Sequence, residues 1–196
     1  MRIIRFKVEG LLERDDPVQA HLHPDLNILT GKNGAGKTNL LKLLWYTVSG
    51  NILLALQEVV FSELEIETDQ YEIKVTRVGP ASCRISYIFE DKDFEFVDQH
   101  DEFGEFAEDM ANEQLREIGA SVFLPTFRRI EGGFGLKTRA RRAAGLAQRT
   151  RGEVEEALSE LSRGLSHSAH TFVSSISTSD VNALLLRKYA DLSDQS

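Results

Sequence analysis

The chain has 196 residues, of which 41% are hydrophobic and 28% are charged, so it has enough apolar surface for a core and is neither disordered nor fibrous. No apolar run approaches the roughly 20 residues of a membrane-spanning helix. A single cysteine, Cys83, excludes an internal disulfide. The sequence therefore predicts a cytoplasmic protein that does not bind to a membrane.

The net charge of −8 hides two segments of opposite sign. Residues 90–117 carry 12 acidic and two basic side chains, whereas residues 128–151 carry eight basic side chains and one acidic one. The acidic balance by itself disfavours nucleic acid as a partner, but the basic segment leaves contacts to DNA phosphates open. A solvated face of a helical arm is the alternative interpretation of that segment.

The amino-terminal part alternates between apolar and polar residues, which is typical of β-strands that are buried on one face. Strands are expected over residues 1–8 and 18–22. A third, more apolar strand is expected over residues 26–30, where it runs straight into a glycine-rich loop. From Thr38 the leucines follow the 3.6-residue period of a helix, which Gly50 ends.

The middle of the chain changes period twice. A second helix is expected over residues 52–61, and alternation with period two follows over residues 62–98. Turn residues between the apolar runs favour an antiparallel meander. An acidic helix is expected over residues 101–118 and a short strand over 121–124. After residue 133 the pattern is helical to the end of the sequence.

One motif carries chemistry: the segment from Gly31 to Thr38 matches G-x-x-x-x-G-K-[ST] at every fixed position. Its glycines let the backbone approach an anion, and its N–H groups, with the start of the following helix, bind phosphate. Lys37 places a charge on the β- and γ-phosphates, and Thr38 offers a hydroxyl to Mg²⁺. The motif predicts ATP and Mg²⁺ as cofactors; the alternative is a glycine loop that only caps a helix. The predicted nucleotide-binding residues are Gly31, Lys32, Asn33, Gly34, Ala35, Gly36, Lys37, Thr38 and Asn39, with Thr38 as the Mg²⁺ ligand.

The segment Gly-x-Asn-Gly-x-Gly-Lys-Thr, followed by Asn-Leu-Leu-Lys, resembles the ABC-type ATPases of the SMC, RecF and OLD-like group. The opening Ile-x-x-Phe-Lys strand and the expected meander fit the amino-terminal lobe of those heads. Residues 123–133 are similar to a phrase in bacterial AAA-family ATPases, some of which are anti-phage defence subunits of the Septu or retron-associated kind. The implied fold is α/β: a P-loop NTPase with an ABC-ATPase-like amino-terminal lobe, an antiparallel β-meander and a helical extension.

The resemblance implies an ATP-binding lobe over residues 1–135 and a helical arm or insertion over 136–196. It also implies that ATP is sandwiched between two heads, so a homodimer or higher homo-oligomer is expected, with a nuclease or DNA as a further partner. A complete head would hydrolyse ATP to drive DNA repair, another DNA-directed activity or anti-phage defence. The alternative functions are a small self-contained P-loop phosphotransferase and an ATP-gated scaffold for a nuclease partner.

Three motifs of a complete head are not evident, so the catalytic residues stay unassigned. A Walker B strand would end in acidic residues; Glu90-Asp91 follow an apolar run, but the solvated end of a meander strand is the alternative. Leu161–Gly164 resembles a signature motif inside a helical stripe. Where the family has a Q-loop glutamine, this chain has Thr126, Arg128 and Arg129. We therefore expect the nucleotide-cradling half of a head, completed by a longer chain or a partner.

Five further residues carry structural expectations. Trp45 and Tyr46 in the first helix are expected in the core or at an interface, and Cys83 on a strand is expected in the core. His167 and His170 are three positions apart and are expected at the surface, with metal ligation as the alternative.

Overall fold

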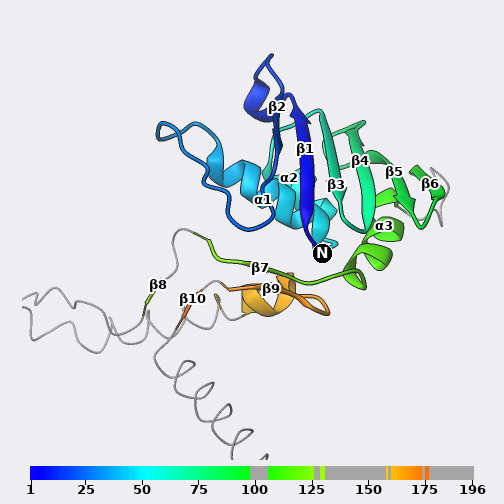
Figure 1. The fold of residues 1–196 in the computed structure, drawn as a ribbon. Helices are drawn as coiled ribbons and strands as arrows, with labels where there is room; N and C mark the ends of the chain where they lie inside the picture. Colours follow the sequence, from blue (N-terminus) through cyan, green and yellow to red (C-terminus); the bar gives the residue numbers. More distant parts are fainter. Residues whose placement is uncertain (98–105, 126–128, 131–157, 159, 174, 177–196) are drawn as a thin grey trace, which may run out of the picture. The chain divides into compact units, whose positions relative to one another are not determined.

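A six-stranded antiparallel sheet dominates the computed structural model, which describes residues 1–97, 106–125, 129–130, 158, 160–173 and 175–176. The strand order is β2-β1-β3-β4-β5-β6 (Figure 1). The strands are β1 (Ile3–Glu9), β2 (Val18–His21), β3 (Glu63–Thr68), β4 (Tyr71–Arg77), β5 (Cys83–Phe89) and β6 (Lys92–Val97). The two amino-terminal strands and the meander are thus confirmed, as is the mixed α/β class.

The sheet has one apolar face because its register aligns the apolar positions of neighbouring strands. Phe6 pairs with Ile66, which pairs with Ile73, which in turn pairs with Tyr87. These four side chains are at most 5% exposed. Since a strand alternates with period two, this register places every other residue of each strand on the opposite face. Cys83 lies on the apolar face and is buried, as expected.

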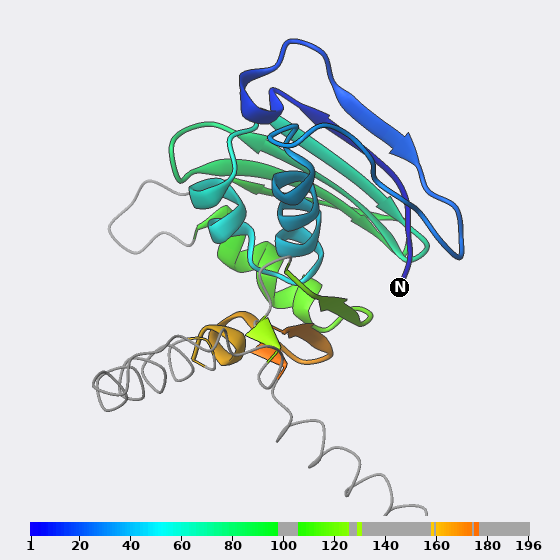
Figure 2. The same ribbon diagram turned by 90° about the vertical axis from the view of Figure 1, so that its left-hand side faces the viewer.

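Helices α1 (Lys37–Val48), α2 (Ile52–Glu58) and α3 (Ala107–Arg116) cover the apolar face, which Figure 2 shows from the side. Each helix contributes a fully buried side chain: Leu43 from α1, Ile52 from α2 and Leu115 from α3. The burial of each stabilises the fold by about 1.5–3 kcal/mol relative to an exposed side chain. Trp45 and Tyr46 are also buried, which confirms their placement in the core.

The second helix ends three residues earlier than expected. Val59 has extended backbone angles, and the carbonyl of Val60 accepts a hydrogen bond from the N–H of Leu12 at 2.9 Å. Leu12 belongs to the short 3₁₀ turn η1 (Leu11–Glu13) between β1 and β2. The helix thus ends where the backbone hydrogen bonds to a loop that is distant in the sequence.

The strand expected over residues 26–30 is not formed. This segment has no regular secondary structure, and Leu26 and Ile28 are 71% and 77% exposed. A strand needs a neighbour for its N–H and C=O groups, and none of the strands in the described ranges pairs with this segment.

The expectation of uninterrupted helix after residue 133 is wrong for the described part of that region. Residues 160–165 are helical, but β9 (His170–Phe172) and β10 (Ser175–Ile176) follow. β9 pairs with β7 (Ser121–Phe123), which confirms the strand expected over 121–124, and β10 pairs in parallel with β8 (Arg129–Ile130). The last part of the expected helical region, residues 177–196, and most of the basic segment lie outside the described residues.

The chain divides into two compact units. Unit 1 comprises Met1–Ser121 and His167–His170, and unit 2 comprises Val122–Ser166 and Thr171–Ser196. Within unit 2, the rings of Phe123 and Phe172 stack with centroids 5.7 Å apart. The boundary at residue 135 stays a prediction. In the described ranges, no helix is both long and apolar enough to span a membrane.

The polar face of the sheet carries a ladder of ion pairs between neighbouring strands. The Nζ of Lys74 on β4 lies 2.7 Å from Glu63 Oε1 and 3.0 Å from Glu65 Oε1, and Arg5 pairs with Glu67 at 2.9 Å. A shallow depression of about 270 Å³ lies over these side chains. Since its charges are paired with one another, we interpret this face as a solvated surface.

Replacing Lys74 with methionine should lower the free energy of unfolding by less than about 1 kcal/mol near neutral pH, because the pairs it breaks are only partly buried and remain accessible to water. The hydrogen bond from Lys74 lowers the pKa of Glu65 from its ordinary 4.5. The stabilisation is therefore present above that value and is lost as the pH falls through the lowered pKa. Urea denaturation at neutral and acidic pH, in low and high salt, measures this. A loss that is independent of both salt and pH would contradict the prediction.

Candidate functional site

The glycine-rich loop leads directly into α1, as expected, but the strand expected before the loop is not formed. Gly36 caps the helix with φ of 84°, and its carbonyl accepts the first helical hydrogen bond from the N–H of Leu40 at 2.9 Å. The N–H groups of the first helical turn have no partner inside the helix. Together with the helix dipole, they favour an anion at this end of α1.

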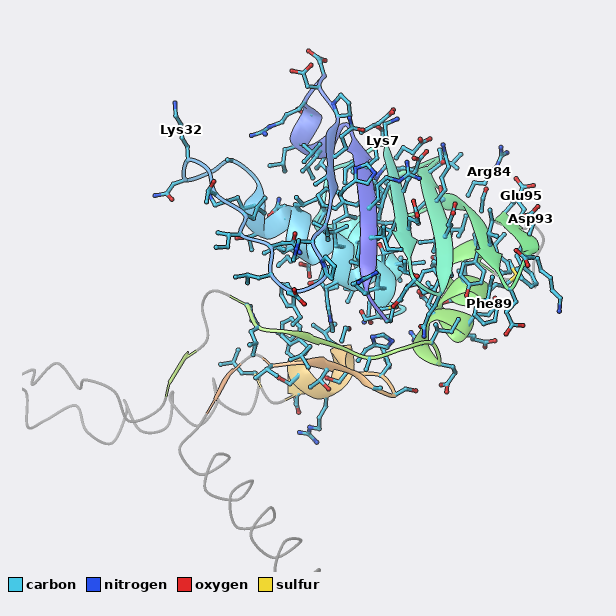
Figure 3. All side chains as sticks on the ribbon, viewed as in Figure 1. Lys7, Lys32, Arg84, Phe89, Asp93 and Glu95 are labelled. Atoms are coloured by element: carbon cyan, nitrogen blue, oxygen red, sulfur yellow. The ribbon has the colours of Figure 1, made fainter. Side chains whose placement is uncertain are left out.

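Lys37 folds back over the loop. Its Nζ donates to the carbonyls of Gly31 at 2.7 Å and Lys32 at 2.8 Å. The side chain of Lys32, in contrast, points away from the body of the unit (Figure 3). One of the two loop lysines is therefore positioned by the loop itself, and only this one has its charge against the loop backbone.

The loop needs its glycines. Gly31, Gly34 and Gly36 all have positive φ, where other residues are strained. A Cβ on Gly36 would lie 2.8 Å from the Cδ1 of Leu12, whereas a Cβ on Gly34 would meet nothing within 4 Å. The open space at Gly34 fits an anion that approaches the backbone. Leu12 of η1 therefore packs against Gly36, a contact that no motif or periodicity indicates.

The other predicted residues lie in the loop and in the first turn of α1. Asn33 is exposed, the N–H of Ala35 donates to the Lys32 carbonyl at 3.2 Å, and Thr38 and Asn39 are half-buried in the first turn of α1. Among the described residues, no three histidine, cysteine or acidic side chains gather as a metal site. Mg²⁺ typically keeps several waters and binds through phosphates and one or two carboxylates, so Thr38 as a Mg²⁺ ligand stays a prediction.

The structure does not bring Glu90 and Asp91 to this loop. Both are exposed and have positive φ (51° and 60°) in the two-residue turn between β5 and β6, as in a type I′ hairpin. Phe89, which precedes them, and Lys32 lie on opposite sides of unit 1 (Figure 3). The interpretation of this pair as a solvated strand end is confirmed.

The remaining motif candidates lie elsewhere. Leu161–Gly164 falls within the helical residues 160–165 of unit 2, as its apolar stripe indicated. Arg129 is in β8, and Thr126 and Arg128 lie outside the described residues.

The surface position expected for His170 is wrong, because this side chain is completely buried. Its Nδ1 lies 2.7 Å from the Ser121 hydroxyl, and its Nε2 lies 3.2 Å from the Ile118 carbonyl. A histidine is readily buried when both ring nitrogens have partners. Both partners come from a different part of the chain, so local sequence carries no signal for this burial.

No known protein-family model matches the sequence, and no curated protein matches it either. The class of the protein therefore follows from its own sequence and fold alone. It is a mixed α/β protein with a G-x-x-x-x-G-K-T loop at the amino terminus of a buried helix.

Proposed function

We propose that this protein binds ATP with Mg²⁺ at the loop from Gly31 to Thr38, as the amino-terminal lobe of an ABC-type ATPase head. The observation that carries the proposal is the position of the Lys37 ammonium, which the loop holds at its own carbonyls beside the start of α1. There, phosphate oxygens can replace the two neutral carbonyls as partners of Lys37. The N–H groups of the first turn can then donate to the same phosphates.

We further propose that ATP joins two such heads, and that hydrolysis is completed by groups beyond this lobe. Support comes from Leu26, Ile28 and Leu29 just before the loop, which are 71%, 77% and 46% exposed. Large apolar side chains gain free energy when another surface covers them. The proposed activity of the complete, cytoplasmic head is DNA-directed or anti-phage, with DNA or a nuclease as partner, and it rests on the resemblance of the sequence.

The two alternatives differ in what supports them. A self-contained phosphotransferase would need Glu90 and Asp91 at the Mg²⁺ ion, and their place in a remote hairpin turn disfavours it. An ATP-gated scaffold uses the same loop and differs only in its lack of turnover. Light scattering with and without ATP, together with a phosphate-release assay, distinguishes the head from the scaffold.

Titration calorimetry of the full chain should detect one bound ATP per chain, with higher affinity in Mg²⁺ than in EDTA. Thr38→Val keeps the shape of the side chain but removes the hydroxyl that would face Mg²⁺. It should weaken Mg-ATP binding about tenfold, which corresponds to about 1.4 kcal/mol, and should change binding in EDTA little. Thr30→Val, at an exposed position before the loop, is the matched control. Equal losses of ATP affinity with and without Mg²⁺ would contradict the role of Thr38 as a Mg²⁺ ligand. Failure of the unaltered chain to bind ATP would overturn the proposal.

A further inference from the structure

Residues 167–170 are held against the rest of unit 1 by a chain of partly buried hydrogen bonds. The indole Nε1–H of Trp45 in α1 donates to the Ser121 hydroxyl at 3.1 Å, and this hydroxyl lies 2.7 Å from His170 Nδ1. The opposite ring nitrogen, Nε2, lies 3.2 Å from the carbonyl oxygen of Ile118. Since a carbonyl only accepts, Nε2 carries the proton, and Nδ1 accepts from Ser121. Of the two neutral tautomers of His170, the geometry therefore selects the one that is protonated on Nε2.

His167 provides a second attachment. Its Nε2 lies 3.2 Å from the Oδ1 of Asn51, in the turn between α1 and α2. The backbones of His167 and His170 hydrogen bond to each other in both directions, at 3.0 and 2.7 Å, so the two side chains are presented by one tight turn. Between them, the hydroxyl of Ser168 donates to Glu117 Oε1 at 2.9 Å.

A proton on His170 Nδ1 would place a positive charge on a ring that is completely buried. The Ser121 hydroxyl, which donates to the neutral ring, would have to turn so that its oxygen accepts from Nδ1 as well as from Trp45. Burial lowers the pKa of His170 from its ordinary 6.5, and the positive charge of the amino terminus lowers it further. Hydrogen bonds to the backbone of Ile118 and Leu115 act in the opposite direction.

The surroundings of His167 have the same preference. Burial lowers the pKa of His167, and the positive charges of Arg116 in α3 and of a protonated His170 lower it further. In the part of the chain that the structure describes, the charged groups that act on this turn include Arg116, the amino terminus and Glu117, and the carboxylate of Glu117 already accepts from Ser168.

We propose that residues 167–170 are an acid-released clasp. This turn stays bound to the rest of unit 1 while His167 and His170 are neutral, and it detaches when they are protonated. Release breaks the contact between Ser121 and His170 and changes the environment of Trp45 near the end of α1. The proposal does not depend on ATP being the ligand at the other end of that helix.

The direction of the pH dependence follows from the lowered pKa values. The detached histidines bind protons more readily than the attached ones, so the clasp is favoured above about pH 6.5 and weakens as the pH falls below it. Between the two pKa values, the ratio of detached to attached chains rises up to about tenfold per pH unit for each histidine.

Trp45 is the single tryptophan of the chain and reports on the clasp directly. We expect its fluorescence, and the resonance of its indole N–H, to change reversibly on acidification, with a midpoint below about 6.5. His170→Asn can still accept from Ser121 but cannot be protonated near this pH, so it should remove or strongly reduce the transition. His21→Asn changes an exposed histidine of β2 and should leave the transition unchanged.

Circular dichroism over the same pH range separates release from unfolding. A Trp45 signal that stays flat, or a transition retained in a variant carrying both His167→Asn and His170→Asn, would overturn the proposal. So would loss of the β-sheet signal with the same midpoint. If His170→Asn does not fold, the ring resonances of His170 in the unaltered chain must titrate with the midpoint of Trp45, and different midpoints would contradict the clasp.

Discussion

Replacing Lys37 with alanine should reduce the affinity for Mg-ATP by at least about a hundredfold, which corresponds to about 2.7 kcal/mol. In the structure the Lys37 ammonium donates to the carbonyls of Gly31 and Lys32. Its removal takes away the charge that the loop itself holds in place, and it leaves these two carbonyls without this donor. The phosphates of ATP would then depend on backbone N–H groups alone.

Two matched variants separate the position of this charge from its sign. Lys32→Ala removes a charge from the same loop, but its side chain points outward, so we expect a loss of only a few fold that disappears in high salt. Lys92→Ala removes a charge on β6 and should have no effect. Calorimetry with ATP, together with thermal unfolding of each variant, makes the comparison. Unchanged affinity in folded Lys37→Ala would contradict the proposed site.

Replacing Gly50 with alanine should destabilise unit 1 by about 2–4 kcal/mol. Gly50 joins α1 to α2 with φ of +67°, and an added Cβ would lie 2.9 Å from the backbone oxygen of Asn112 and 2.6 Å from the Cγ of Arg116. The Nε of Arg116 also donates to the Gly50 carbonyl at 3.0 Å, and the N–H of Ile52 donates to Asn112 Oδ1 at 3.2 Å. Because the turn is bonded to α3, the clash cannot be relieved without moving that helix.

Gly34→Ala is the matched control for this substitution. Gly34 has a similar φ of +78°, but nothing lies within 4 Å of the position of its Cβ. Its replacement should cost only the backbone strain, about 1–2 kcal/mol. Urea denaturation of both variants gives the two free energies of unfolding, and their difference measures the clash with α3. Equal losses would show that α3 shifts at little cost.

Local pattern predicted the parts of the fold that depend on local interactions. The alternation over residues 62–98 predicted β3 to β6 because each strand presents one face to the core. The spacing of the leucines after Thr38 predicted α1 because this helix also turns apolar residues toward the core. The apolar segment over 26–30 has an equally good strand pattern, but it has no pairing partner in the described ranges. A strand pattern thus indicates only that a segment is able to pair.

The sequence by itself determined the candidate site, because the residues from Gly31 to Asn39 are consecutive and their spacing already predicts a phosphate-binding loop at the start of a helix. The tertiary structure alone decided that Leu12 packs on Gly36, that Glu90 lies in a remote hairpin turn, and that His170 is buried. Each of these depends on contacts between residues far apart in the chain. Such contacts are set by the pairing of strands and the packing of helices, which no local pattern records.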